Sequence, residues 1–499
     1  MSKFNNKTRN TTKETNLGGG VGFKRTDLKQ EIASVVMNSL LNGDSYYESD
    51  SDRIVKIENL MKSQGDAEFL AKAMVYTRTV GNLRSVSHLM GTILTENAKG
   101  TSFLRPALRK AIVRPDDATE MVALYSNRNI NKMVPNSLRR AIKDNLETKW
   151  DEYQLKKYAG ESNSVKLKDI VKLTHPNPKG LVTSGKAKDP FVFKRIIEST
   201  LDNIQTAQTV NAGSTGEDRA KNYKSMLMER KLGYMAALKN IKNILESGAD
   251  SQTIDMLCDL LRNERAVLNS KVLPFRFTQA YVTVENMNMD RILAKKVLLA
   301  IEDGFIISAR NVPIIDEDES IALLLDESGS MGNGSSLTDQ TPFMIGKTLM
   351  ASILTGIDTS KAVGYLWADR AREVSVDGRP FDFIKRTRTQ GYGTNVAAAF
   401  EGLLKTKTKV DKLVIITDMQ HNYLSSVDNK IADYKRLVNP NVKVMFWNVQ
   451  GYGGSTPCRM SKDVLEMTGF SDKMLEVAAK MMKYSDASYL IKEIEAIQL

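Results

Sequence analysis

The sequence predicts an array of α-helical pairs followed by a doubly wound α/β domain. The 499 residues are too many for one hydrophobic core, so at least two domains are expected. Up to about residue 300 the apolar residues recur with the helical period. The acidic run Asp316–Glu319 then marks a change, after which apolar strand-like runs alternate with helices, as in a doubly wound sheet.

The composition is that of an ordinary globular protein, with 41% hydrophobic and 26% charged residues. No run of 18 or more apolar residues occurs, so no membrane span is expected, and the N-terminus lacks the apolar stretch of a secretory signal. The isolated cysteines Cys258 and Cys458 favour a reducing, cytoplasmic setting without a disulfide framework. With three histidines in the chain, any metal is expected to be a hard cation with oxygen ligands.

The charge of the chain is unevenly distributed. Residues 311–499 hold 22 Lys and Arg against 24 Asp and Glu, whereas residues 1–310 hold 49 against 35. The net charge of +12 therefore arises from an excess of 14 positive charges in the first part. A basic module joined to a near-neutral one indicates a polyanion partner for the basic module. The alternative is a basic surface that serves solubility.

Residues 1–20 are polar and end in Gly18-Gly19-Gly20, which predicts a disordered basic tail. Beyond it, short breaks separate segments with helical periodicity, which suggests stacked helical pairs, an α-solenoid, although no fixed repeat length is visible. The predicted helices are Asp27–Leu41, Asp66–Val80, Arg84–Glu96, Ser137–Leu146, Asp189–Ile204, Glu217–Glu246, Asp250–Leu261 and Asp290–Ile301.

The second part is predicted to be a parallel sheet with helices between or after its strands. The predicted strands are Ile321–Leu325, Ala362–Trp367, Leu413–Thr417 and Val442–Val449. The predicted helices are Thr341–Thr355, Asn395–Leu404 and Asp472–Met482.

Polar residues cluster where open parallel sheets bind their ligands, beyond the carboxyl ends of the strands. One predicted strand runs into Asp326-Glu327-Ser328-Gly329-Ser330, another runs into Asp418, and a glycine-containing loop carries Thr394. Two carboxylates and three hydroxyls suit Mg²⁺, which prefers octahedral oxygen ligands. We expect Ser328, Ser330 and Thr394 to bind the cation directly, and Asp326 and Asp418 to act directly or through water. The alternative is that the two serines cap a helix and Asp418 is a turn residue.

In order and loop context, Asp326-x-Ser328-x-Ser330, Thr394 and Asp418 resemble the metal-ion-dependent adhesion site of von Willebrand factor A domains. The resemblance implies a Rossmann-like A domain over residues 316–499. An enzyme is not expected. A haloacid-dehalogenase phosphotransferase needs a second carboxylate where this chain has Ser328, and no phosphate-binding loop or nucleophile–histidine arrangement is recognisable.

Four segments of the helical part resemble the TROVE domain of the Ro ribonucleoprotein family. They lie at residues 76–85, 135–143, 150–176 and 231–240. The resemblance implies that residues 21–315 form a ring of HEAT-like helical repeats ahead of the A domain. It also implies binding of small noncoding Y RNAs on the outside of the ring and of single-stranded ends of misfolded RNAs in its hole. Bacterial relatives are associated with exoribonucleases.

Several basic residues then become candidates for phosphate contacts, since neutralising phosphates supplies most of the affinity for RNA. The candidates are Arg139, Arg140, Lys143, Lys157, Lys166, Lys168 and His175, with Arg78 and Arg84 as residues that line the hole. Arg139 and Lys143 share one helical face. His175 has the alternative of a turn residue before Pro176. Arg78 and Arg84 have the alternative of pairing with acids on neighbouring helices. Glu161 stands where a basic residue is expected, which weakens the case for the usual RNA.

Two function hypotheses follow. The first is a cytoplasmic, monomeric ribonucleoprotein scaffold in RNA quality control or maturation, whose metal site recruits an exoribonuclease or another protein. The second is a Mg²⁺-dependent protein-interaction module on a helical scaffold that binds no RNA. A Mg²⁺-dependent nuclease or phosphatase ranks third.

Overall fold

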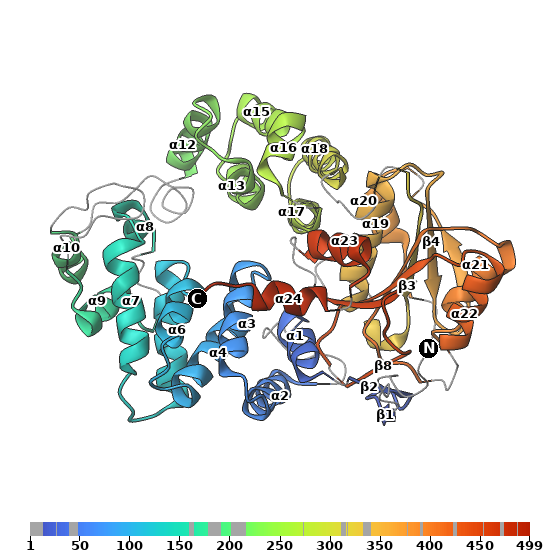
Figure 1. The fold of residues 1–499 in the computed structure, drawn as a ribbon. Helices are drawn as coiled ribbons and strands as arrows, with labels where there is room; N and C mark the ends of the chain where they lie inside the picture. Colours follow the sequence, from blue (N-terminus) through green and yellow to red (C-terminus); the bar gives the residue numbers. More distant parts are fainter. Residues whose placement is uncertain are drawn as a thin grey trace. The chain divides into compact units, whose positions relative to one another are not determined.

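The computed structural model of the chain describes most of the molecule (Figure 1). The described residues are 13–25, 27–38, 48–158, 164–177, 191–200, 216–272, 274–310, 316, 318–332, 341–376, 378–389, 393–422, 427–452, 454–469, 474–486 and 488–499. They fall into two compact units. The sheet unit comprises residues 1–38, 45–48 and 214–490, and the helical unit comprises 39–44, 49–213 and 491–499. The boundaries at residues 21 and 316, which rest on the polar tail, the acidic run at 316–319 and the family resemblance, remain predictions.

Short α-helices with defined ends make up the helical unit. They are α2 (Asp50–Ser63), α3 (Ala67–Thr79), α4 (Arg84–Asn97), α5 (Leu104–Ala111), α6 (Pro115–Arg128), α7 (Asn136–Thr148), α8 (Glu152–Lys157), α9 (Leu167–Thr174) and α10 (Val192–Glu198). Side-chain caps start several of them: Ser49 caps α2, Asp66 caps α3 and Asp151 caps α8. Each such cap satisfies an amide that the first helical turn leaves unpaired, so the helix start is encoded locally.

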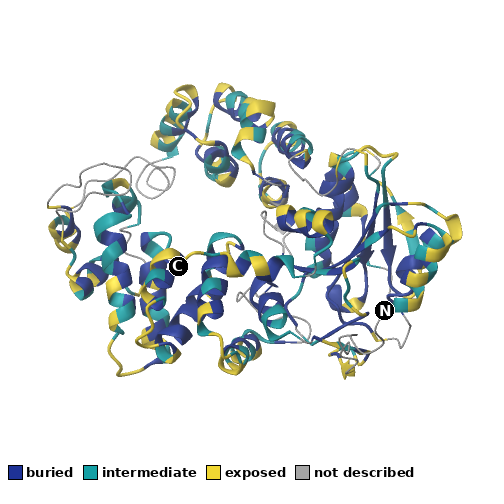
Figure 2. Ribbon diagram, viewed as in Figure 1, coloured by how far each residue is buried: buried dark blue, intermediate teal, exposed yellow. Residues whose placement is uncertain are grey.

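The helices of this unit pack pairwise, as the periodicity predicted. Helix α3 packs against α4 and α5, α4 against α6, and α7 against α5 and α9. Figure 2 shows the inward faces as buried and the outward faces as exposed. Trp150 is fully buried and donates from Nε1 to the carbonyl of Val113 at 3.0 Å, which joins the end of α7 to the loop before α6. An amphipathic helix is stabilised mainly by such packing and much less by its own propensity.

The sheet unit contains a second group of helices. They are α1 (Leu28–Asn38), α12 (Gly216–Met228), α13 (Tyr234–Lys239), α14 (Ile241–Glu246), α15 (Ser251–Leu261), α16 (Glu264–Ser270), α17 (Phe275–Glu285) and α18 (Arg291–Ala309). The prediction of one helix over Glu217–Glu246 was wrong, because three helices occupy this stretch. Arg230 adopts a left-handed φ of 54° after α12, and Gly233 and Asn240 stand at the starts of α13 and α14.

A six-stranded sheet forms the second part of the sheet unit. Its strands are β3 (Ile321–Asp326), β4 (Ala362–Trp367), β5 (Ala371–Val374), β6 (Lys412–Thr417), β7 (Lys443–Asn448) and β9 (Val464–Thr468). Their order is β5-β4-β3-β6-β7-β9, with every pair parallel except β4 and β5. This is the strand order of a doubly wound sheet: the chain adds strands outward from β3 on one side and then outward from β6 on the other, so the winding reverses between β3 and β6. The predicted fold class is confirmed to the level of a helix-rich chain with a mixed sheet in its C-terminal part.

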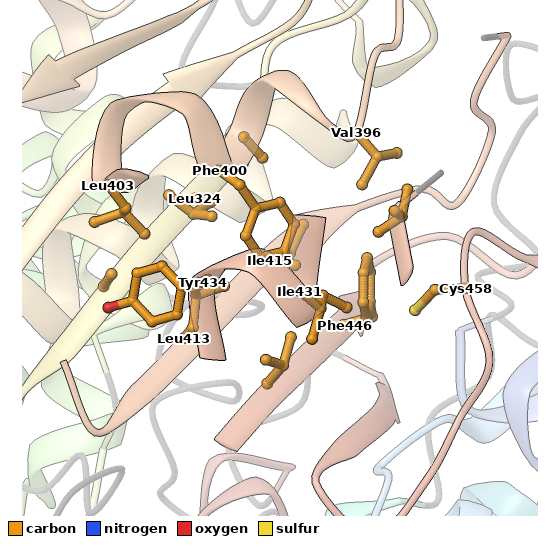
Figure 3. Packing of buried hydrophobic residues seen from close by; sticks show 14 of the residues in the cluster. Leu324, Val396, Phe400, Leu403, Leu413, Ile415, Ile431, Tyr434, Phe446 and Cys458 are labelled. Carbon is orange, nitrogen blue, oxygen red and sulfur yellow. The ribbon is translucent and has the colours of Figure 1, made fainter. Parts of the chain in front are cut away.

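Helices cover both faces of this sheet. On one face, alternate residues of the strands, among them Leu324, Leu413 and Phe446, pack against α21 (Ala398–Thr406) and α22 (Val427–Leu437), as Figure 3 shows. On the other face lies α19 (Pro342–Gly356), which packs against β3, β4 and β6. A Cβ at Gly346 of α19 would stand 2.3 Å from Leu325 Cδ1, so glycine permits this close approach. Helix α20 (Pro380–Arg386) packs against α19, and α23 (Met474–Tyr484) packs against β9. Helix α24 (Tyr489–Glu495) lies mostly in the helical unit.

A small antiparallel sheet begins the chain. Strand β1 (Lys13–Thr15) pairs with β2 (Val21–Lys24), and β2 pairs with β8 (Ser455–Thr456). Residues 1–12 of the expected disordered tail lie outside the described residues, but residues 13–20 have a defined conformation, in contrast to that expectation. The reason is tertiary, because Asn16 is buried against the sheet domain. Among the described helices, none combines the length and the apolar character that a membrane crossing requires.

Candidate functional site

The predicted metal residues lie at the point where the sheet reverses its winding. Strands β3 and β6 are parallel neighbours, with Leu325 beside Ile416, so Asp326 and Asp418 both emerge at their shared carboxyl edge. The hydroxyl of Thr417 donates to Asp326 Oδ2 at 2.7 Å, which ties the two strand ends together. Both aspartates are 0% exposed. Ligands of open α/β sheets bind in such crevices at the switch point.

The loop after Asp326 turns back on itself, as the sequence spacing predicted. The amide of Ser328 donates to Asp326 Oδ1 at 2.8 Å, and the hydroxyls of Ser328 and Ser330 lie 3.4 Å apart. A single 3₁₀ turn, Gly329–Met331, follows, and Ser328 makes no side-chain cap for it. The geometry therefore disfavours the capping alternative for Ser328 and leaves both hydroxyls on one side of the loop.

The two carboxylates destabilise each other's charged forms. Burial raises the pKa of Asp326, and the negative charge of Asp418 raises it further. Burial also raises the pKa of Asp418, against hydrogen bonds from the Gln420 amide and Ser330 that lower it. Among the described residues neither carboxylate has an ion-pair partner, and Asp418 Oδ2 is buried without a hydrogen bond. Two buried carboxylates without a counter-charge are costly unless a cation accompanies them.

The third predicted loop reaches the same edge through the chain that follows Asp418. The amide of Thr394 donates to Asn422 Oδ1 at 2.9 Å, and Thr394 is buried. The amide of Gly393 donates to Asp369 Oδ2 at 3.2 Å. Sequence reasoning missed Asn422 and Asp369. Asp369 had a signal that was not used, since it follows the predicted strand Ala362–Trp367 at the same edge of the sheet.

These residues fit a hard divalent cation. Buried carboxylate and hydroxyl oxygens are the ligands that Mg²⁺ prefers, and Asp418 Oδ2 has no competing donor among the described residues. The described part of the chain contains no group of three or more His, Cys, Asp or Glu side chains that could hold a metal. At this site there are two carboxylates, so hydroxyls must supply the remaining ligands.

Three of the predicted RNA contacts lie together on the helical unit. Arg139, Arg140 and Lys143 project from α7, where Arg140 is exposed and Lys143 is partly exposed. The amide of Asn177 donates to Glu147 Oε1 at 2.6 Å, and Lys143 lies 3.9 Å from the same carboxylate. The segment that carries the exposed His175 is therefore tied to α7 beside Lys143. His175 adopts a left-handed φ of 46° at the end of α9, which is the turn role weighed for it.

The other candidates of this region lie at helix ends. Lys157 ends α8 and lies 5.5 Å from the ring centre of Tyr158, which also receives the guanidinium of Arg114 at 5.5 Å. Lys166 precedes α9 and Lys168 lies in its first turn. Residues 159–163, which include the unexpected Glu161, lie outside the described residues.

Arg78 and Arg84 take the second of the two roles weighed for them, since both pair with acids of α6. Arg78 is buried and contacts Asp117 at 2.8 Å. Arg84 contacts Asp117 at 2.8 Å, Glu120 at 2.8 Å and Asp116 at 3.0 Å. The Arg78 guanidinium, buried against one carboxylate, and the Arg84 guanidinium, held by three, are poor candidates for phosphate contacts. Sequence reasoning could not name these partners, because they lie more than thirty positions away.

His88, which is itself buried, completes this cluster of charged groups. Its Nδ1 lies 3.2 Å from Glu120 Oε2 and its Nε2 3.5 Å from Asp117 Oδ1. Burial on its own lowers the pKa of His88, but the hydrogen bonds and charges of Asp117 and Glu120 outweigh it, so the pKa is raised. The pKa of Asp117 falls far below its usual range, because His88, Arg78 and the Arg114 amide outweigh its burial.

With this geometry in place, the chain can be compared with known proteins. The TROVE domain matches residues 28–226 and 212–310, more than half of the chain, so this protein belongs to the TROVE domain family. That family, which includes the Ro proteins, is generally RNA-binding and is not known for enzymatic activity.

A solved structure and two curated proteins are similar to this chain. The crystal structure of the Deinococcus radiodurans Ro (RSR) protein superposes with a TM-score of 0.59 at 16% identity, over 90% of this chain and 99% of that one, which shows a shared fold. Telomerase protein component 1 of Rattus norvegicus is 23% identical over 300 residues, 44% of this chain and 11% of its own length. The mouse protein is 27% identical over 70 residues, 14% of this chain and 3% of its own. The matches thus span about a tenth or less of these two relatives.

Proposed function

We propose that this protein is a cytosolic, monomeric scaffold that binds small structured noncoding RNA of the Y type and single-stranded ends of misfolded RNA. Membership of a generally RNA-binding family supports RNA binding as such, without indicating which RNA is bound. The observation that carries it to this chain is the set of exposed basic side chains on α7 and the segments tied to it. Arg140, Lys172 and His175 are exposed and have no ion-pair partner among the described residues.

This basic surface suits the backbone of a nucleic acid. Lys and Arg that neutralise phosphates release condensed counterions, so the affinity for RNA should fall steeply as salt rises. Tyr153 is 49% exposed on α8 and offers a face on which an unpaired base can stack. The acidic side chains nearby, such as Glu147 and Glu152, are engaged with neighbouring groups and reduce this charge only in part. A closed ring of HEAT-like repeats remains part of the proposal.

The test is RNA binding at several salt concentrations, with RNA that co-purifies from the host as ligand. Replacing Arg139, Arg140 and Lys143 by alanine should weaken binding. It should also reduce the slope of log K against log salt by about 0.7 for each single-strand phosphate that the variant no longer neutralises. The matched control removes three exposed lysines from the sheet unit, Lys405, Lys407 and Lys409. An equal loss in both triple variants would show only a general charge effect and contradict the assignment to α7.

We further propose that the six-stranded sheet and the helices that cover it form a von Willebrand A-type domain that holds Mg²⁺. Ser328, Ser330 and Thr394 would bind the cation directly, and Asp326 and Asp418 directly or through water. Bound there, the cation would supply a Lewis-acidic site for an oxygen ligand from a partner such as an exoribonuclease. The uncompensated carboxylates support this role, because a cation offsets their mutual repulsion.

The second candidate function is a metal-dependent protein-interaction module without RNA. The buried carboxylates Asp326 and Asp418 are the observation that favours it, since they stand apart in sequence from the basic helices. Affinity capture from host extract separates the two. Discrete RNA that is lost at high salt supports the ribonucleoprotein function. Protein partners without RNA, released by EDTA, would replace it with the second function.

A further inference from the structure

The start of the described chain lies against the loop that follows Asp418. We call residues 13–24, which include β1 and β2, the N-terminal strap. Asn16 Nδ2 donates to the carbonyl of His421 at 2.8 Å and to that of Met419 at 3.4 Å, and it lies 3.0 Å from His421 Nδ1. The amide of Leu17 donates to Gln420 Oε1 at 2.8 Å. The strap thus contacts three consecutive residues beyond Asp418.

Glycines make this approach sterically feasible. Asn16 and Gly20 close a turn, in which the Asn16 amide donates to the Gly20 carbonyl and the Gly20 amide donates to Asn16 Oδ1, both at 2.8 Å. A Cβ at Gly20 would stand 2.1 Å from the carbonyl oxygen of His421, and one at Gly18 3.2 Å from that of Gln420. Gly19, between them, has a φ of +84°. Gly18-Gly19-Gly20, expected to end a disordered tail, is a contact surface.

The loop under the strap is connected to two predicted ligand positions. The amide of Gln420 donates to Asp418 Oδ1 at 3.0 Å, and Oδ2 has no hydrogen-bond partner in the described part of the chain. Asn422 accepts the amide of Thr394 at 2.9 Å. Met419 has a φ of 65°, a left-handed conformation that a residue with a long side chain rarely adopts. A backbone in this region persists when surrounding contacts hold it, and the strap supplies one at the Met419 carbonyl.

We infer that the N-terminal strap is a positioning element of the metal centre, with Asn16 as its positioning residue. The inference rests on the proposed metal function. By binding the Met419 and His421 carbonyls, Asn16 fixes the loop that orients Asp418 and, through Asn422, Thr394. Groups that orient metal ligands from outside typically change metal affinity by about 10- to 100-fold when they are removed.

The test uses the full chain with Asn16→Ala and Gly20→Ala, and with Lys13→Ala as the control. Lys13 is an exposed residue of β1 that makes none of the contacts to the loop described above. Isothermal titration with Mn²⁺ should show about a 10-fold or greater loss of affinity in the first two variants and no loss in the control. In EDTA, hydrogen exchange of residues 418–422 should accelerate in the same two variants only.

The outcomes separate this inference from the metal function. If the wild-type protein binds no Mn²⁺, the proposed metal centre is wrong, and faster exchange in Asn16→Ala still shows that the strap orders the loop. If the wild type binds Mn²⁺ and both variants bind it equally well, the inference is overturned. A lower unfolding temperature with unchanged Mn²⁺ affinity also overturns it, because the strap would then be merely structural.

Discussion

Arg78 donates two hydrogen bonds to a single oxygen of Asp117, from Nε at 3.2 Å and from Nη2 at 2.8 Å. The same oxygen also accepts the amides of Val113 and Arg114, each at 2.9 Å. Asp117 therefore holds a buried cation and the start of α6 at once. Because Asp117 has this dual role, the guanidinium of Arg78 is bound within the protein and is a poor candidate for a phosphate contact.

Asp117→Ala should lower the free energy of unfolding by about 3–5 kcal/mol, because it leaves the buried Arg78 without its partner. Urea denaturation measures the change. Asp144→Ala is the matched control. Asp144 also accepts from the Nε and Nη2 of one arginine, Arg105, but this ion pair is exposed to solvent. Its loss should cost less than about 1 kcal/mol. Equal costs for both variants would contradict the structural role of Asp117.

The raised pKa of His88 predicts a pH-dependent stability. A group whose pKa is higher in the folded protein contributes stability below its unfolded pKa, about 6.5, and loses it as pH rises through the folded value. The free energy of unfolding of the wild type relative to His88→Gln should therefore decline as the pH rises above about 6.5. Asp117 and Glu120 have lowered pKa values and stay ionised across this window. If the stability difference between the wild type and His88→Gln instead rises with pH, Asp117 and Glu120 do not stabilise the charged form of His88.

Arg84→Ala should leave RNA binding and its salt slope unchanged while it lowers stability. Its guanidinium already contacts Asp116, Asp117 and Glu120, so it has little capacity left for a phosphate. Filter binding over a salt series, with urea denaturation in parallel, measures both effects. A slope of log K against log salt that becomes shallower by about 0.7 corresponds to one phosphate on a single strand, and it would show that Arg84 contacts RNA.

The effect of Asp326→Asn on stability should change sign when metal is added. In EDTA the variant should melt at or above the wild-type temperature, because it removes the repulsion between Asp326 and Asp418. With Mg²⁺ at about 100 times its Kd, the wild type should gain about 2.7 kcal/mol and become the more stable protein. Differential scanning calorimetry in both conditions measures this. RNA binding should persist in the variant, and its loss in a folded variant would show that the two sites depend on each other.

Local patterns predicted the parts of the fold that local chemistry encodes. The strand Ala362–Trp367 was predicted with the bounds it has, because a buried parallel strand is a nearly continuous apolar run. The same reasoning put Asp326 and Asp418 at one edge of the sheet. The break between α12 and α13 was missed, because the helical period continues through Arg230, whose left-handed φ depends on its surroundings.

The remainder depends on partners that are distant in sequence. Thr417 and Asn422 are hydrogen-bonded to residues of the proposed metal site, but a short polar side chain gives no sign in the sequence of which carboxylate or amide it will meet. For Arg78 and Arg84 the sequence left two roles open, a place in the hole or pairing with acids, and only the position of Asp117 decides between them. Asn16 read as part of a polar tail, because its partners lie 403 to 405 positions further along.

That separation has a consequence for how the protein is made. The strap is synthesised well before its docking loop, Met419–His421, which follows about four hundred residues later. At about 5–20 residues per second, the strap waits on the order of 20–80 seconds for its partner. The helical unit, whose residues lie almost entirely before residue 213, can fold within that interval. Docking of the strap is therefore among the last steps of folding, and the proposed metal centre should form only after the sheet is complete.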